Sequence, residues 1–554
     1  MAENFSDAEK SVLSRFCSST ERDVFVLRNL PESVKGALFS RYSRSAKRLR
    51  RLLLDEFLSN ADLGIGVSGL ESAASGAPVD VAKAHAFFER VLDGYGDDSV
   101  GELGGCHVAF ENVSILAAKE IEDARIGGSP LEKSTRYVYF DQKVDNDYLF
   151  FKEPRLMASK HSNLYLETCR GLFDAYARLA GPMSSWMETQ FPPDSFTFMV
   201  DTSTREEKKL SDIADETVKK RALSAYKAAL RANVCDILRY LLPPATLTNM
   251  GVYGNGRFFE YLLRRLYSSP LAEMNELGTT LRRELDIEIP AFVRRAKKDD
   301  YLVASRHSFK SALAPLIIGS PSAPPERVTL ADFDSNGERS VLAAILFSAG
   351  NASLADCRAR AASLSVEQKN QVLKAYIGHR RNRRDRPGRA LENAFFEFDI
   401  ACDYGAYRDI QRHRMLTLER QYFSPHLGYE LPREILHTEF EEPMRRALES
   451  AADAFKIIAK EFPLEAQYVV PFAYRVRFRM KLNLREAIHF CELRSVKQGH
   501  ASYRDIAQQM AQSIMRATPL FASCFAFVDF NDYHLGRLAA EMSQEHKRAK
   551  WAGQ

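Results

Sequence analysis

The sequence predicts an α+β fold made of two helix-rich domains in tandem, each with a central mixed or antiparallel sheet. Apolar residues recur about every 3.6 positions in 36–58, which is typical of an amphipathic helix. Ile506, Met510 and Ile514 recur every four residues, and Pro519 limits the helix that they indicate. Such apolar stripes are expected to form helix faces that pack into a core.

Strands and a domain boundary complete the predicted architecture. The runs 136–140 and 473–482 alternate between apolar and polar residues, as half-buried strands do. The stretch 315–338 is rich in Pro, Ser and Gly and is typical of a linker. We therefore expect a first domain over 1–314 and a second over 339–554.

Composition favours an ordinary cytoplasmic globular protein. The 554 residues are 45% apolar and 27% charged, and the net charge of +4 is too small to indicate a nucleic-acid partner. No apolar run reaches the ~18–20 residues that a membrane helix needs, and the polar N-terminal residues lack the apolar segment of a signal peptide. Eight scattered cysteines without a C-x-x-C pair argue against a disulfide framework and a zinc site.

The two parts of the chain are similar to each other. Residues 110–126 align with 398–414, and residues 238–265 align with 466–494 in the same order and at nearly the same spacing. Identity is low, so chance similarity is the alternative. We favour an internal duplication because order and spacing agree together.

One motif is divided between the two copies. The second copy has Arg412-His413-Arg414 followed by "LERQYFSP", and the first has "SPLEKSTRY" (129–137) preceded by Ala124-Arg125-Ile126. Together they resemble the signature R-H-R-x-x-S-x-N-E-x-S-x-R-Y of the flavin-dependent thymidylate synthases. The second copy keeps its start and the first keeps its end.

Further positions of that family are divided in the same way. "GDDSVGELGG" (96–105) resembles a flavin-contacting segment, with Asp97 in place of a histidine. Arg239 precedes Leu242-Pro243, where the family has a phosphate-binding arginine, and Arg494 stands where the family has an arginine against the uracil. The resemblance leaves out an insertion at about 140–235 and the residues at about 295–335.

The resemblance implies a set of site residues and co-substrates. Arg494 would be catalytic, because a guanidinium beside the uracil stabilises the charge of an ionised N3. The nucleotide would be bound by Glu132, Ser134, Thr135, Arg136, Arg239, Asp409, Arg412 and Arg494. FAD would be bound by Ser99, Glu102, Glu392, Arg412, His413, Arg414, Asn483, Arg485 and His489. NADPH and methylenetetrahydrofolate would be co-substrates, dUMP the substrate, and no metal ion is expected.

The division of the motif predicts one working site per chain, in a homodimer that mimics the family's tetramer, and leaves open whether the two sides of the site meet within one chain or across the dimer. The reciprocal site, built from Ala124-Arg125-Ile126 and "LERQYFSP", should be inactive. Two alternatives stay open: alkylation of another pyrimidine nucleotide, and a non-catalytic flavin- or nucleotide-binding protein. The arginine-rich run 379–392 is either a solvated face or a phosphate clamp, with RNA binding disfavoured because aromatic residues do not alternate with its arginines.

Overall fold

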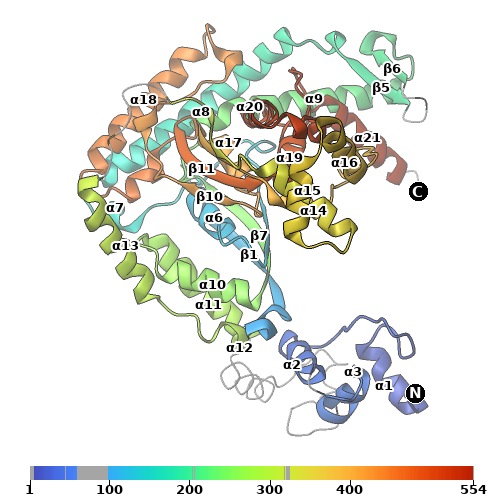
Figure 1. The fold of residues 1–554 in the computed structure, drawn as a ribbon. Helices are drawn as coiled ribbons and strands as arrows, with labels where there is room; N and C mark the ends of the chain where they lie inside the picture. The colour runs from blue at the N-terminus through green and yellow to red at the C-terminus, as the bar shows by residue number, and fades with distance from the viewer. Residues whose placement is uncertain are drawn as a thin grey trace. The chain divides into compact units, whose positions relative to one another are not determined.

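The computed structural model describes residues 5–43, 45–58, 98–201, 204, 206–316, 319 and 325–552 (Figure 1). Two compact units divide the chain. Unit 1 comprises Met1–Val113, Ala117–Lys133 and Thr248–Ile317, and unit 2 comprises Ser114–Leu116, Ser134–Leu247 and Ile318–Gln554. The segment 134–247 therefore belongs to the same unit as the second half of the sequence. The duplication with a boundary at 315–338 stays a prediction.

Unit 1 holds a three-stranded sheet in the order β1-β7-β2. Strands β2 (Gly128–Glu132) and β7 (Leu247–Asn255) pair antiparallel, from Gly128 opposite Gly254 to Glu132 opposite Met250. Glycines are needed here, since a Cβ on Gly128 or Gly254 would come within 2.4 Å of the Phe258 ring. The remaining elements are α1 (Asp7–Phe16), α2 (Glu32–Tyr42), α3 (Leu49–Leu52), η1 (Leu53–Leu58), η3 (Asp98–Glu102), β1 (Gly105–Ser114), α6 (Ile115–Glu122), α10 (Gly256–Tyr267), α11 (Ala272–Glu288), α12 (Pro290–Val293), α13 (Asp300–Leu313) and η7 (Ala314–Leu316).

Unit 2 is built on a four-stranded antiparallel sheet in the order β10-β11-β9-β8. Its strands are β8 (Val328–Phe333), β9 (Phe395–Asp403), β10 (Thr417–Arg420) and β11 (Arg475–Asn483). Helix α20 (Ala501–Ala517) packs against β8 and β9, and α17 (Tyr404–Ile410) packs against β9 and α20. The core lies between the sheet and these helices, where Phe398, Ile400 and Met510 are fully buried.

The predicted insertion folds mainly as two long helices. These are α8 (Ser162–Gln190) and α9 (Glu216–Leu238), which pack against each other, and α8 also packs against α18 (Glu441–Ile458) (Figure 1). Asp215 caps α9 by accepting from two backbone amides of its first turn. The smaller elements of this region are β3 (Lys143–Val144), β4 (Asp147–Tyr148), α7 (Pro154–Met157), η4 (Pro193–Ser195), β5 (Thr197–Asp201), β6 (Glu206–Lys209), η5 (Leu210–Asp212) and η6 (Arg239–Leu241).

The second half of the sequence supplies the other helices of unit 2. Helix α19 (Leu484–Arg494) packs against α20, and α21 (Leu538–Ala552) packs against α9. Asn483 begins α19 by accepting from the Glu486 amide at 2.9 Å. The others are α14 (Gly337–Ala349), α15 (Leu354–Ser363), α16 (Val366–Ile377), η8 (Arg389–Asn393), η9 (Pro425–Leu427), η10 (Arg433–Ile435), η11 (Glu465–Val469) and η12 (Pro519–Phe525).

The helix-rich α+β prediction is confirmed, and three local predictions need correction. The run 136–140 forms a turn instead of a strand, because its side chains are fixed by separate contacts, such as that of Arg136 with Asp236. The predicted helix over 36–58 is interrupted after Tyr42 and resumes at Leu49. Part of the predicted linker 315–338 is strand β8, which pairs with β9.

The expectations about membrane helices and metal sites can be compared with the residues that the structure describes. Within the described ranges, no helix is long and apolar enough to cross a membrane. No group of His, Cys, Asp and Glu side chains in these ranges could hold a metal ion. The eight cysteines are free thiols, and seven of them are buried.

Candidate functional site

Asp409 lies at the centre of the candidate site, in unit 2. Its Oδ2 is 3.4 Å from Nη1 of Arg239. Burial opposes ionisation of Asp409, but four arginines hold its pKa well below the usual range. We call them the arginine cluster: Arg239, Arg412, Arg136 and Arg494. Two come from each half of the sequence, and all four lie in unit 2.

Arg136 is held by an ion pair that the motif does not predict. Its Nε and Nη2 lie 2.6 and 2.7 Å from the two carboxylate oxygens of Asp236 in α9, and its Nη1 donates to the Tyr503 hydroxyl at 3.0 Å. Burial opposes the charge of Arg136, but Asp236, Tyr503 and Asp409 together outweigh burial and raise the pKa of Arg136 well above its ordinary value. The two-point contact fixes the plane of the guanidinium. Through Asp236 and Tyr503, Arg136 links helix α9 to helix α20.

Arg239 is a buried cation with unused donors. It follows α9 in η6 and is only 2% exposed. Its Nε and Nη2 have no hydrogen-bond partner among the residues that the structure describes. Gly405 accommodates the guanidinium, since a Cβ there would lie 3.2 Å from both nitrogens. Unsatisfied buried donors cost ~1–3 kcal/mol each, so this arrangement suits an anionic ligand better than it suits stability.

Ser134 and Thr135 border the arginine cluster. Thr135 Oγ1 accepts from Nη1 of Arg408 at 3.3 Å, and Ser134 Oγ accepts from the Arg136 amide at 3.2 Å. The predicted nucleotide-binding residues in unit 2 are thus Ser134, Thr135, Arg136, Arg239, Asp409, Arg412 and Arg494.

Arg494 ends α19 and is oriented by His413. Its Nε donates to His413 Nε2 at 2.9 Å, and its guanidinium carbon lies 5.5 Å from the centre of the Tyr503 ring. The other ring nitrogen of His413 lies 2.8 Å from Glu486 Oε1. Burial lowers the pKa of His413 well below its ordinary value, and Arg494 adds to this effect. His413 is therefore neutral near pH 7.

Glu132 lies in unit 1, at the end of β2. Its buried carboxylate accepts from Nζ of Lys119 at 2.8 Å, and the same ammonium pairs with Glu122. Lys119 is 1% exposed. Lys119 is thus a structural partner of Glu132 in the folded chain. The predicted role of Glu132 in nucleotide binding stays a prediction.

The predicted flavin-binding residues are divided between the two units. In unit 1, Glu102 pairs with Arg257 at 2.6 Å, and the side chain of Ser99 lies outside the described residues, as does Asp97. In unit 2, Arg485 and Glu392 form an ion pair at 3.2 Å. The other members in unit 2 are Arg412, His413, Arg414, Asn483 and His489.

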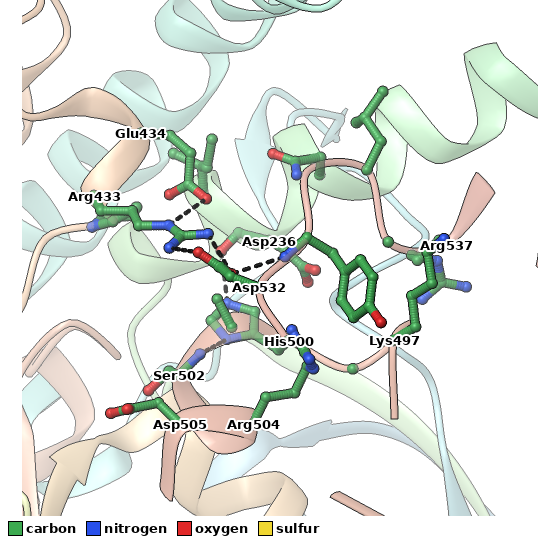
Figure 2. Close-up of a pocket in the computed structure, with 18 of the residues that line it drawn as sticks. Asp236, Arg433, Glu434, Lys497, His500, Ser502, Arg504, Asp505, Asp532 and Arg537 are labelled. Carbon is green, nitrogen blue, oxygen red and sulfur yellow. Dashed lines mark hydrogen bonds and ion pairs between the residues drawn. The ribbon is translucent and has the colours of Figure 1, made fainter. Parts of the chain in front are cut away.

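A cavity of about 550 Å³ opens beside Arg136 in unit 2 (Figure 2). Asp236 and His500 are among the residues that line it, and Arg433 forms an ion pair with Asp532 in the same lining. Of the predicted nucleotide-binding residues, Arg136 alone is among the side chains that line this cavity. We therefore place the candidate nucleotide site at the arginine cluster, because that is where the predicted residues converge.

Comparison with known proteins decides the family. The profile of the family described as thymidylate synthase complementing protein matches residues 68–291 and 329–520. The chain belongs to this family. The divided motif predicted this family correctly, and the two matched segments agree with the predicted tandem arrangement.

Relatives of this chain match it over nearly its whole length. A UPF0159 protein of Chlamydia pneumoniae is 45% identical over 552 residues, covering 98% of each chain. A UPF0159 protein of Thermoplasma acidophilum is 35% identical over 525 residues, covering 93% of this chain and 99% of the relative. A solved UMP/dUMP methylase of Streptomyces cacaoi, bound with 5-Br dUMP, is 14% identical with a TM-score of 0.27, and covers 36% of this chain and 95% of its own.

Three residues of the candidate site are not part of the family motif and could not be found from it. Asp236 holds Arg136, Tyr503 contacts both Arg136 and Arg494, and Glu486 contacts His413. Asp236 lies three residues before Arg239 on the same helical segment, so its proximity to the site could have been inferred. The contact of Glu486 in α19 with His413, which follows α17, depends on tertiary packing that the sequence does not reveal.

Some arginines of the run 379–392 form ion pairs that hold unit 2 together. Arg380 forms a two-point ion pair with Glu492, at 2.9 and 2.5 Å, and both side chains are buried. Arg389 and Arg485 both pair with Glu392. A solvated face is therefore a correct description of only part of the run, such as Arg381, whose side chain is 75% exposed.

Arg380→Ala is expected to destabilise unit 2 by about 3–5 kcal/mol, because it leaves the carboxylate of Glu492 buried without its partner. Urea denaturation followed by tryptophan fluorescence measures the change. Arg381→Ala is the matched control, since it removes an exposed arginine of the same run and should change stability by less than about 0.5 kcal/mol. Equal effects of the two substitutions would contradict the assignment.

Stability is expected to fall as pH decreases from 6.5 toward 4, partly because of His500. Burial, with Arg239 next in effect, lowers the pKa of His500 to about 4 from 6.5. Below pH 6.5 the unfolded chain therefore binds a proton that the folded chain does not, which removes roughly 3 kcal/mol by pH 4. His413 contributes in the same direction, because burial also lowers its pKa in the folded chain. Thermal midpoints of His500→Asn, which retains a helix-capping oxygen, should fall less steeply than wild type, and an identical slope would refute the prediction.

Proposed function

We propose that this chain is a flavin-dependent thymidylate synthase that methylates dUMP to dTMP at one composite site per chain. The observation that carries the proposal is the convergence of four arginines from both halves of the sequence on Asp409. Four guanidinium groups against this single carboxylate, with Asp236 paired to Arg136, provide a local excess of positive charge. Such a site favours a phosphorylated ligand.

The nucleotide phosphate is assigned to Arg239 and Arg136. Arg239 has two buried donors without partners among the described residues, and phosphate oxygens accept such donors well. Arg136 is already held in one plane by Asp236, so little side-chain entropy is lost when a ligand binds. Thr135 adds a hydroxyl beside Arg408. Together these groups fix one end of the nucleotide.

The uracil is assigned to Arg494. Methylation at C5 requires electron density on the ring, which increases when N3 loses its proton. Arg494 makes its one described hydrogen bond through Nε, so its two terminal nitrogens are available to O2 and N3 of a uracil. The ring of Tyr503 lies beside the same guanidinium. No cysteine is proposed as a nucleophile, since the thiol groups of Cys402 and Cys491 have raised pKa values caused by burial.

The residues around His489 fit the pyrophosphate of FAD. Arg386 and Arg383 act electrostatically on His489, and neither forms an ion pair with a residue that the structure describes. Arg485 lies close enough to act on Glu486 in the same region. These residues, with Arg412, Arg414 and Asn483, would hold FAD. When bound, FAD would supply reducing equivalents and handle the carbon derived from methylenetetrahydrofolate, with NADPH as the hydride donor.

The proposal is tested by release of tritium from C5-labelled dUMP, with methylenetetrahydrofolate, NADPH and FAD present. We expect release that depends on dUMP and on each co-substrate, and a flavin absorption band in the purified protein. A parallel reaction with C5-labelled UMP identifies the alternative: release from UMP but not from dUMP would assign the site to another pyrimidine nucleotide. A protein that binds no FAD and releases no tritium from either nucleotide would overturn the proposal.

A further inference from the structure

Glu486 has a contact that the proposed function does not require. It lies in the first turn of α19, and its Oε1 is 2.8 Å from Nδ1 of His413. Nε2 of the same imidazole accepts from Nε of Arg494 at 2.9 Å. The three side chains therefore form a chain of two hydrogen bonds that ends at the arginine assigned to the uracil. His413 is 6% exposed, so water does not readily replace either bond.

Hydrogen-bond chemistry fixes the proton of His413. A guanidinium nitrogen only donates, so Nε2 of His413 must be unprotonated to accept from Arg494. The proton of the neutral ring must then be on Nδ1, from which it is donated to Glu486. A ring with its proton on Nε2 would place two donors against each other. Glu486 is thus the group that favours the tautomer on which the Arg494 contact depends.

We propose that Glu486 is a positioning residue that orients Arg494 through His413. The acceptor oxygen of Glu486 selects the Nδ1-protonated imidazole, and the imidazole holds the inner nitrogen of Arg494. Both terminal nitrogens of that arginine are then directed to the ligand in a single orientation. The inference rests on the proposed function for the identity of the ligand, but the hydrogen-bond order does not depend on it.

Other charged groups around Glu486 do not take over this role. His489, Arg386, Arg485 and Arg494 all act on its carboxylate, while burial raises its pKa. His489 lies 5.7 Å from His413 between ring centres, and both ring nitrogens of His413 are already in hydrogen-bond contact with Glu486 and Arg494. Among the described residues, Glu486 is the carboxylate in hydrogen-bond contact with His413.

The test compares Glu486→Ala with Glu486→Gln in the full-length protein. The glutamine keeps an acceptor oxygen for Nδ1–H, and the alanine does not. Titration calorimetry with dUMP should show binding about ten- to a hundredfold weaker for Glu486→Ala and within about threefold of wild type for Glu486→Gln. Glu419→Ala removes an exposed carboxylate, 69% exposed, and should leave dUMP binding unchanged.

Two further readouts separate positioning from a general structural effect. In an Arg494→Lys background, which lacks the donating Nε, Glu486→Ala should cause no additional loss of dUMP affinity. In ¹⁵N-histidine NMR spectra, the His413 signal, assigned by its absence in His413→Asn, should show protonated Nδ1 in wild type and protonated Nε2 in Glu486→Ala. Equal additional loss in both backgrounds, or the same tautomer in both proteins, would overturn the inference.

The NMR readout also distinguishes two kinds of failure. If wild type binds no dUMP while His413 changes tautomer as expected, the proposed ligand is wrong and the positioning role of Glu486 stands. If wild type binds dUMP and His413 does not change, the positioning role is wrong and the proposed function stands.

Discussion

Arg494→Ala is expected to lower the rate of dUMP turnover by at least ~10²–10³-fold, the loss that follows removal of one donor to developing charge. Arg494 is the member of the arginine cluster that is oriented by His413 and has terminal nitrogens available to a ligand. Release of tritium from C5-labelled dUMP measures the rate. Stability should change little, because burial already lowers the pKa of Arg494 and disfavours its charge.

Arg125→Ala is the matched control for Arg494→Ala. Arg125 lies in unit 1, in the segment that aligns with Arg412-His413-Arg414 of the second copy. If the reciprocal site is inactive, this substitution should leave turnover within a factor of about two of wild type, since a stability change below about 0.5 kcal/mol keeps the protein folded. A loss from Arg125→Ala as large as that from Arg494→Ala would show that the reciprocal site works and would refute one site per chain.

Arg239→Met is expected to change stability and binding in opposite directions. Arg239 is buried, with Nε and Nη2 lacking partners among the described residues, and it shares Asp409 with three other arginines. Methionine fills a similar volume without unsatisfied donors. We expect the free energy of unfolding to be unchanged or raised by up to about 2 kcal/mol, because two unsatisfied buried donors are removed while Asp409 keeps the other three arginines. The affinity for dUMP should fall at least ~10²-fold, since a charged hydrogen bond to phosphate is lost.

Urea denaturation and calorimetry on the same preparation measure both effects of Arg239→Met. Leu241→Met, a substitution of a fully buried neighbour in η6, controls for repacking and should leave dUMP affinity unchanged. A destabilised Arg239→Met protein that still binds dUMP at wild-type affinity would assign Arg239 to the fold and not to the ligand.

The sequence predicts the family and the division of the motif between two copies because both depend on residue type and spacing. Arg136, Arg239 and Arg494 are recognisable from their places in the divided signature, and all three lie in unit 2. Helix α20 and strand β11 are also recognisable, since each has a clear periodicity. These features are local in the sequence or follow from the comparison of two copies.

Other features depend on tertiary packing and could not be predicted in this way. The run 136–140 alternates like a strand, but the pair of Arg136 with Asp236 holds its first residue in a turn. The partner of Glu132 is Lys119, which lies thirteen residues earlier and on a helix. Glu486 reaches His413 across 73 positions of the sequence. In each case a side chain from another element decides the outcome.

The most direct measurement of the central claim is complementation between two inactive chains. Arg136→Ala removes the first half of the composite site and Arg494→Ala removes the second, so the two variants carry complementary defects. If the site forms within one chain, as their placement in unit 2 indicates, co-expression of the two variants should yield no dUMP turnover above that of either variant alone. Recovery of about a quarter of the wild-type rate, expected when half-sites pair at random in a two-fold dimer, would show that the site forms between chains and would contradict the account.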